Sequence, residues 1–103
     1  MRDRQPCVYI LTSKRNGTLY IGVTSDIIQR IHQHRIGSVP GFTHDYRVNR
    51  LMWFEQHSTM EEAILREKRL KKWNRTWKIT LIEELNPHWD DLAIGFGFPR
   101  LSD

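Results

Sequence analysis

Two short runs of β-forming residues flank an Asn-Gly pair near the N-terminus, and this arrangement restricts the fold more than any other feature of the sequence. The runs cover residues 7–12 and 18–23, with Asn16 and Gly17 between them. An Asn-Gly pair between apolar runs is typical of a tight β-hairpin turn. The chain is therefore expected to begin with two antiparallel strands.

The register of this hairpin predicts which side chains share a face of the sheet. If the Asn-Gly pair is a two-residue turn, Tyr20 lies opposite Ser13, which shares a face with Tyr9 because side chains alternate along a strand. The two tyrosines are thus expected on one face. Gly22 falls on the same face, where a glycine leaves room for close approach of a ligand or backbone. The other face carries the apolar residues expected in the core, which are Val8, Ile10, Leu19, Ile21 and Val23.

The rest of the chain predicts three helices and a third strand. Asp26 precedes an apolar stripe at helical spacing and is a candidate N-cap, and Ser58 and Thr59 precede two glutamates in the same way. The expected elements are a helix from residue 27 to near 37, a strand over 48–55, and helices over about 60–73 and 75–85. The predicted order is ββαβαα, in an α+β fold.

Length and charge narrow the class of protein. The 103 residues suffice for one domain, expected over 1–93 with a loosely docked tail over 94–103. The formal net charge is +4 and the isoelectric point is near 9.6. This basic balance fits a polyanion such as nucleic acid, although many basic surfaces only face solvent. No apolar run is long enough to cross a membrane and no signal peptide is recognised, so a cytoplasmic location is expected.

The cysteine and histidine content argues against a disulfide or a structural zinc site. Cys7 is the single cysteine, and the five histidines lack the spacing of zinc ligands. A Gly-rich phosphate loop and a dinucleotide fingerprint are also absent from the sequence. No small-molecule cofactor is therefore expected.

Three polar side chains stand beside apolar helical stripes. Glu67 lies in the middle of the stripe of the second predicted helix, where a carboxylate must pair with a cation, bind a metal or open onto a cleft. Arg30 and His34 are four residues apart at the edge of the first helix, which suits a grip on phosphate or two solvated side chains equally well. The two tyrosines also have an alternative role as packing residues.

Taken in order, these residues resemble the GIY-YIG nuclease domain, and most closely its small stand-alone bacterial members. The first signature is represented by Cys7, Val8 and Tyr9, and the second by Tyr20, Ile21 and Gly22. Arg30 and His34 match the positions of the first helix, and Glu67 matches the carboxylate of the second. The resemblance covers about residues 5–93. Further positions similar to the stand-alone members are Gly41 to Thr43, Tyr46, Trp53 to Glu55, Ala63 to Trp73, Asn86, Pro87, Trp89, Asp91 and Leu92.

The resemblance implies a three-stranded antiparallel sheet flanked by helices and a divalent-metal endonuclease. It implies that Glu67 binds one Mg²⁺ or Mn²⁺, that Arg30 holds phosphate oxygens, and that Tyr9 and Tyr20 position and help to deprotonate water. His34 is expected to assist as a helper or an alternative base. Nucleic-acid contacts are expected from Arg30, Thr24, Tyr46, Lys71 and Lys72.

Several alternatives stay open from the sequence. Cys7 and Val8 replace the Gly and Ile of the first signature, and Val23 occupies a position that is basic in some branches of the family. The expected substrate is single-stranded, duplex or branched DNA, recognised by structure rather than sequence in DNA repair or processing. The competing roles are a nucleic-acid-binding module without turnover and a structural or protein-interaction domain. The sequence leaves the oligomeric state open.

Overall fold

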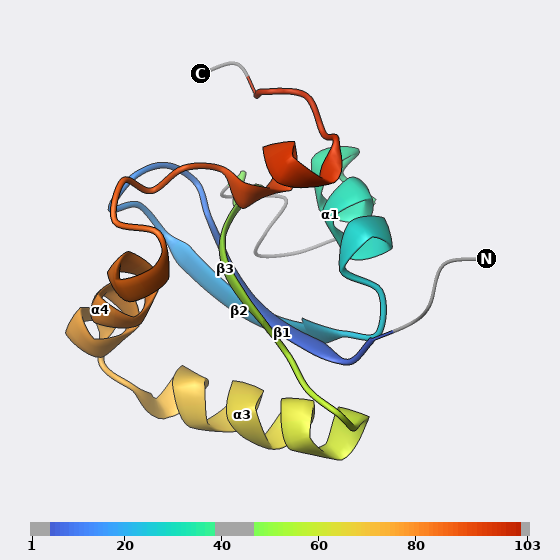
Figure 1. The fold of residues 1–103 in the computed structure, drawn as a ribbon. Coiled ribbons are helices and arrows are strands. Elements are labelled where there is room, and N and C mark those ends of the chain that lie inside the picture. The colour runs from blue at the N-terminus through green and yellow to red at the C-terminus, as the bar shows by residue number, and fades with distance from the viewer. Residues whose placement is uncertain (1–4, 39–46, 102–103) are drawn as a thin grey trace.

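The computed structural model describes residues 5–38 and 47–101 of the chain, and Figure 1 shows its ribbon. The elements are strands β1 (Cys7–Thr12) and β2 (Leu19–Thr24), helix α1 (Ile27–Arg35), strand β3 (Arg50–Gln56), helices α3 (Met60–Lys72) and α4 (Arg75–Leu85), and the 3-10 helix η1 (Leu92–Phe96). The predicted order ββαβαα is confirmed for the described residues, and η1 follows it. None of the described helices combines the length and apolar character needed to span a membrane.

The three strands form one antiparallel sheet in the order β2-β1-β3. All six residues of the central strand β1 are buried. The pairing of β1 with β3 shifts between Ile10 and Leu11, so that Met52 is an extra residue on β3. A bulge of this kind turns neighbouring side chains toward one face, and Met52 and Trp53 both pack in the same core cluster.

The hairpin turn lies one residue earlier than predicted, and this moves each cross-strand pairing by two residues. Leu11 pairs with Tyr20, and the carbonyl of Lys14 accepts a 2.9 Å hydrogen bond from the Gly17 amide, so Arg15 and Asn16 are the central residues. Asn16 has φ 57, a left-handed conformation that asparagine tolerates. A Cβ on Gly17 would lie 2.4 Å from Ser13 Oγ, so the glycine serves close packing instead. Because the shift is two residues, the predicted faces are unchanged.

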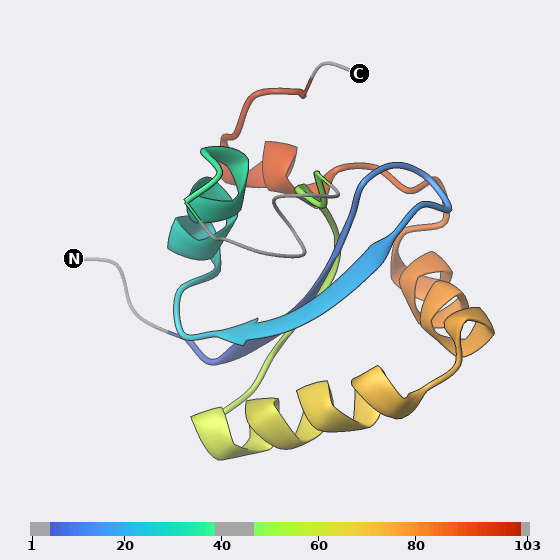
Figure 2. The ribbon, with the colours of Figure 1, turned by 180° about the vertical axis from the view of Figure 1, so that it is seen from behind.

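Each face of the sheet carries its own core. The two opposite views in Figures 1 and 2 show helices on both sides of the sheet. Helices α3 and α4 cover the face of Val8 and Ile10, and this core includes Ala63, Leu70 and Ile82. Helix α1 and η1 cover the tyrosine face, and that core includes Tyr9, Leu11, Ile31, Leu51 and Ala93. The core face predicted from the hairpin pattern is confirmed.

The helix starts follow the expected capping chemistry. The Asp26 carboxylate accepts a hydrogen bond from the Gln29 amide, and the Thr59 hydroxyl accepts one from the Glu62 amide, each at 3.1 Å. These bonds satisfy amides that lack partners in the first turn of a helix. The caps predicted at Asp26 and Thr59 are therefore confirmed.

The segment after Trp89 packs more tightly than predicted. Ala93 is fully buried, and Phe96 and Phe98 pack against the core on the tyrosine face. The centroids of the Phe54 and Phe96 rings lie 5.4 Å apart. The expectation of a loosely docked segment is wrong for residues 94–98, because their two phenylalanines cover apolar surface that the short sheet leaves open.

Candidate active site

Three aromatic rings from three different elements meet on the tyrosine face. Tyr9 comes from the central strand, Tyr20 from the edge strand β2, and His34 from the last turn of α1. The ring centroids are 6.3 Å apart for Tyr9 and Tyr20, 6.0 Å for Tyr9 and His34, and 5.7 Å for Tyr20 and His34. The expectation that both tyrosines share a face is confirmed, and His34 joins them.

The missing side chain of Gly22 leaves the space that the Tyr9 ring occupies. The two residues are paired across β1 and β2. A Cβ on Gly22 would lie 2.4 Å from Tyr9 Oη and 2.5 Å from its Cζ, so any other residue would displace the ring. The glycine leaves room for close approach, but the group that approaches is the Tyr9 side chain and not the ligand or backbone that was expected.

Burial controls the acidity of Tyr9. The side chain is almost completely buried, and this burial raises the pKa of the phenol above its usual value near 10. The neighbouring Tyr20 and Glu67 charges also raise the pKa, whereas the Arg30 charge lowers it. Both Arg30 and Glu67 thus act electrostatically on the Tyr9 hydroxyl. The two residues predicted to contact phosphate and metal therefore lie near the aromatic rings.

His34 contacts Tyr9 directly. Its Nε2 lies 3.2 Å from Tyr9 Oη, and its Nδ1 is buried with no hydrogen-bond partner among the described residues. Desolvation, aided by the nearby Arg30 charge, lowers the pKa of His34 from 6.5 to about 4. The imidazole is consequently neutral at neutral pH.

Glu67 belongs to α3, which covers the other face of the sheet. Figure 2 shows the edge strand β2 lying between α1 and α3. The side chain of Glu67 is 15% exposed, and its Oε2 lies 3.5 Å from Nζ of Lys71, which is 53% exposed. The cation partner that the sequence offered as one alternative is thus present. Because Lys71 is largely solvated and one helical turn away, the pair is a partly exposed i,i+4 contact rather than a fully buried ion pair.

The carboxylate of Glu67 fits a hard divalent cation. Mg²⁺ usually takes only one or two protein carboxylates and completes its shell with water and phosphate oxygens. The described residues contain no group of three His, Cys, Asp or Glu that could enclose a metal by themselves. Glu67 is therefore compatible with a metal shared with a phosphate group, provided that Lys71 moves aside.

The other residues predicted to contact nucleic acid lie in different environments, and not all of them are accessible. Lys72 is exposed at the end of α3. Thr24 is buried, and its hydroxyl accepts from the Asp26 amide at 3.1 Å, so it helps to shape the start of α1. Tyr46 lies outside the described residues.

One polar contact near the site was not predicted. Arg35 forms an ion pair with Asp91, and both side chains are nearly buried. The other carboxylate oxygen of Asp91 accepts from the amides of Leu51, at 3.1 Å, and Ala93, at 3.0 Å. This contact ties α1 to β3 and η1. Its partners are 56 residues apart in the chain, so no local pattern indicates it.

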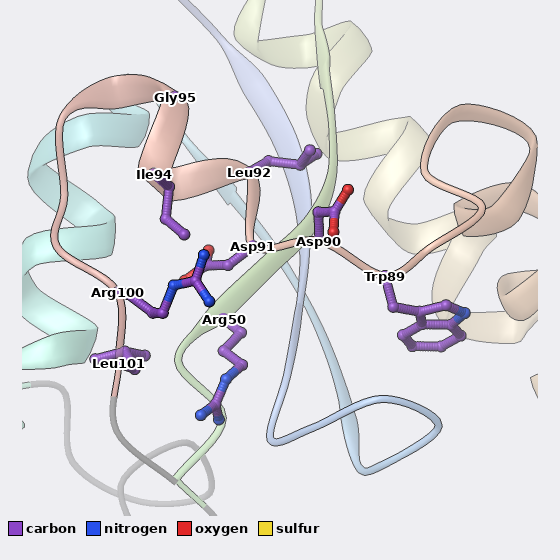
Figure 3. Close-up of a pocket in the computed structure, with 9 residues that line it drawn as sticks. All are labelled: Arg50, Trp89, Asp90, Asp91, Leu92, Ile94, Gly95, Arg100 and Leu101. Atoms are coloured by element: carbon purple, nitrogen blue, oxygen red, sulfur yellow. The ribbon is translucent and has the colours of Figure 1, made fainter.

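A separate cavity of about 570 Å³ lies beside β3, η1 and the C-terminal segment (Figure 3). Its lining includes Arg50, from β3, and Arg100, from the C-terminal segment. None of the predicted site residues within 5–38 and 47–101 lines it. The aromatic cluster and this cavity are therefore distinct.

Comparison with known proteins gives consistent matches. The family model of the GIY-YIG catalytic domain matches residues 5–80. A UPF0213 protein of Staphylococcus saprophyticus is 36% identical over 77 residues, which cover 75% of this chain and 93% of the relative. A UPF0213 protein of Bacillus pumilus is 36% identical over 70 residues, with 68% and 71% covered. The solution NMR structure of a UPF0213 protein from Bacillus halodurans has a TM-score of 0.54 at 27% identity, covering 86% of this chain and 94% of that one.

Proposed function

The chain belongs to the GIY-YIG catalytic-domain family, and from this we propose that it is a divalent-metal-dependent endonuclease that hydrolyses phosphodiester bonds in DNA. Proteins with this domain are generally endonucleases. The observation that carries the proposal is the contact between Tyr9 and His34, beside Tyr20 and within electrostatic reach of Arg30 and Glu67. A proton acceptor, a cation and a carboxylate are the groups that phosphodiester hydrolysis requires.

Tyr9 is the group that accepts the proton of the attacking water in this proposal. It must first lose its own proton, and burial opposes that loss. The charge of Arg30 favours the phenolate, and Arg30 also holds the non-bridging oxygens of the scissile phosphate. Tyr20, half-buried on the edge strand, orients the water. Tyr9 first releases its own proton to solvent. The water oxygen then forms a bond to phosphorus as its proton passes to the Tyr9 phenolate, the bond between phosphorus and the leaving oxygen breaks, and the leaving oxygen takes a proton from solvent.

His34 supports the phenolate through its hydrogen bond. A buried N–H without a partner is costlier than a buried lone pair, so the proton is expected on Nε2 and not on the unpartnered Nδ1. In that tautomer Nε2 donates to Tyr9 Oη. The donated bond grows stronger as negative charge develops on the phenol oxygen. His34 is thereby a positioning and stabilising residue, with no change in its own protonation.

Glu67 is the proposed ligand of Mg²⁺ or Mn²⁺. When bound, such an ion supplies Lewis-acid stabilisation of charge on the phosphate and the leaving oxygen. Glu67 contributes a hard carboxylate oxygen at the edge of the cluster. Release of Lys71 from Glu67 would free the ammonium group to contact a phosphate of the same strand.

The proposed DNA contacts favour recognition of shape over sequence. Arg30, Lys71 and Lys72 are cations suited to phosphate oxygens, and phosphate contacts carry no direct sequence information. We therefore infer a substrate defined by its strand geometry, as in DNA repair or processing. Single-stranded and branched DNA are the leading candidates.

A nuclease assay with a metal titration tests the proposal. Single-stranded, duplex and branched DNA are incubated with the protein at increasing Mg²⁺ or Mn²⁺, with EDTA as the blank. Cleavage that requires metal and is lost in Tyr9→Phe and Arg30→Ala supports the proposed role. Cleavage that persists in both variants, or none with any substrate, contradicts it.

A binding module without turnover is the second candidate. The raised pKa of Tyr9 favours it, because a neutral phenol is a poor base. This candidate predicts DNA binding in the same titration with no product at any metal concentration.

A further inference from the structure

Helix α1 has few contacts of its own that hold its C-terminal end. It is nine residues long, and an isolated helix of this length is unstable in water. Two of its side chains are buried, and these are Ile31 and His34. Within residues 5–38 and 47–101, the His34 imidazole has a single hydrogen bond, to the Tyr9 hydroxyl. The place of the imidazole therefore follows the position of the last helical turn.

Arg35, the next residue in that turn, binds two points of the C-terminal segment, residues 91–99. Its Nη2 forms the ion pair with Asp91, and its Nη1 donates a 2.8 Å hydrogen bond to the Pro99 carbonyl. The guanidinium also lies over the Phe98 ring, 5.2 Å from the centroid, which is within the range of a cation–π contact. The Arg35 and Asp91 side chains are 8% and 9% exposed, so water has little access to them.

The C-terminal segment is itself fixed to the sheet. One carboxylate oxygen of Asp91 accepts hydrogen bonds from the amides of Leu51, in β3, and Ala93, in η1. Ala93 is fully buried, and Phe98 packs against the core on the tyrosine face. Arg35 thus connects the last turn of α1 to a well-packed part of the domain.

We propose that Arg35, held by the C-terminal segment, is a positioning residue that sets His34 against Tyr9. Because Arg35 and His34 are adjacent in one helical turn, a shift of one moves the backbone of the other. This inference rests on the proposed nuclease function, in which His34 stabilises the Tyr9 phenolate. A functional group displaced by about 1 Å can cost about a hundredfold in rate, so the contacts that hold it matter as much as the group itself.

The action of Arg35 on His34 is one of position and not of charge. Desolvation is the main cause of the low pKa of His34, and the charge that lowers the pKa further is that of Arg30. The charge of Arg35 is balanced by the carboxylate of Asp91. Loss of the Arg35 contacts should therefore affect His34 by letting the last turn move.

The pKa of His34 reports such a movement directly. The titratable groups that face the imidazole from the sheet are Tyr9, in β1, and Tyr20, in β2, and both are neutral phenols at the pH values where histidine titrates. If the last turn moves away from the sheet, water reaches the imidazole. Its pKa should then rise from about 4 toward the ordinary value of 6.5.

Asp91→Asn separates position from charge. The asparagine side-chain oxygen can still accept from the two backbone amides, but the ion pair with Arg35 is lost. Removal of a negative charge by itself would lower the pKa of His34, whereas release of the last turn should raise it. An NMR titration of the imidazole measures the direction, and His34→Gln assigns its resonances among the histidines.

Arg35→Lys is the second variant, and it keeps the positive charge beside Asp91. An ammonium group lacks the planar fork with which arginine holds two acceptors at once, so the contact with Pro99 should be lost. The pKa of His34 should rise in this variant too. Because the charge is kept, this variant decides the question even if Asp91→Asn does not fold.

Ile82→Val is the matched control for a general loss of stability. Ile82 is fully buried in the core on the opposite face of the sheet, and the change removes one methyl group there. The pKa of His34 should stay near 4 in this variant.

The nuclease assay provides a second readout. Arg35→Lys should lower kcat about tenfold to a hundredfold and leave KM nearly unchanged, because the nearly buried Arg35 orients a group that acts in the transition state. The NMR titration needs no cleavage. A wild-type protein that cuts no DNA would therefore contradict the proposed function, and the role of Arg35 would still be decided by the pKa of His34.

Three results would overturn the proposal. The first is an unchanged pKa of His34 in Arg35→Lys, and the second is a lowered pKa in Asp91→Asn, since either would leave charge as the only link. The third is an equal rise of the pKa in Ile82→Val, which would show that any loosening of the domain exposes the imidazole.

Discussion

The Tyr9 ring lies against the backbone of Gly22, its partner on the neighbouring strand, at a distance that leaves no room for a Cβ. The glycine of the second signature and the tyrosine of the first are thus one structural unit. The strand pairing that forms the sheet also sets where the Tyr9 hydroxyl meets His34.

Gly22→Ala should displace the Tyr9 ring and break its contact with His34. Overpacking of this kind costs about 1–3 kcal/mol of folding free energy, and cleavage should fall at least as strongly as in Tyr9→Phe. Urea unfolding and the nuclease assay measure the two effects. Gly95→Ala is the control, because an added Cβ there meets nothing within 4 Å. If the two variants lost the same amount of folding free energy and of cleavage activity, the role of Gly22 would be contradicted.

Glu67→Gln should abolish metal-dependent cleavage and leave the melting temperature nearly unchanged. The amide lacks the negative charge that a hard cation needs. The lost contact with Lys71 is a partly exposed i,i+4 pair worth about 0.3–0.5 kcal/mol. Calorimetry and the nuclease assay are run on the variant beside Lys71→Gln, which loses the same pair and keeps the carboxylate. A variant that melts much lower, or that cuts at the wild-type rate, would rule out this role.

Acid should destabilise the protein through His34. The pKa of this residue is about 4 in the folded protein and near 6.5 when exposed, so the unfolded chain binds more protons between these values. Stability should therefore fall as the pH drops from about 6.5 to 4, by up to about 3 kcal/mol. His34→Gln should remove this part of the pH dependence, as measured by urea unfolding at a series of pH values. An unchanged slope in the variant would assign the acid sensitivity to other groups.

DNA binding should weaken steeply with salt. Each phosphate contact contributes a slope of about −0.7 to −0.9 in a plot of log affinity against log salt concentration. Lys71→Gln and Lys72→Gln should each reduce the slope by about that amount in fluorescence anisotropy titrations. Lys14→Gln, in the exposed hairpin turn, is the control with the same charge change. Binding that does not depend on salt would argue against phosphate contacts altogether.

Asp91→Ala should be strongly destabilising. The change leaves Arg35 nearly buried without its partner and removes the acceptor of two backbone amides, which costs about 3–5 kcal/mol. Asp90→Ala is the matched control, since Asp90 is exposed and bonds to Asn86 through its backbone. Similar melting temperatures for the two variants would show that the ion pair contributes little.

The parts of the fold that local chemistry decides were predictable from the sequence. Caps at Asp26 and Thr59, the core face of Val8 and Ile10, and the shared face of the tyrosines all follow from spacing and residue type. The hairpin register was wrong by two residues because Asn16 takes the left-handed position and Gly17 makes room for Ser13. An even shift leaves every side chain on its predicted face.

The parts that long-range packing decides were not predictable. No local pattern links Arg35 to Asp91, and a Phe-Gly-Phe sequence alone gives no sign that it covers the tyrosine face. The protonation of His34 and Tyr9 likewise depends on burial, which appears only when α1 meets the sheet.

The central position of β1 gives the candidate active site two parts of unequal mobility. Amide hydrogens of a fully buried central strand exchange with deuterium only when the domain unfolds, whereas an edge strand and a nine-residue helix open more readily. Tyr9 lies on the slowly exchanging strand, and Tyr20 and Arg30 lie on the elements that open. In the proposed nuclease, an incoming DNA strand would therefore be accommodated by movement of Tyr20 and Arg30 around a stationary Tyr9.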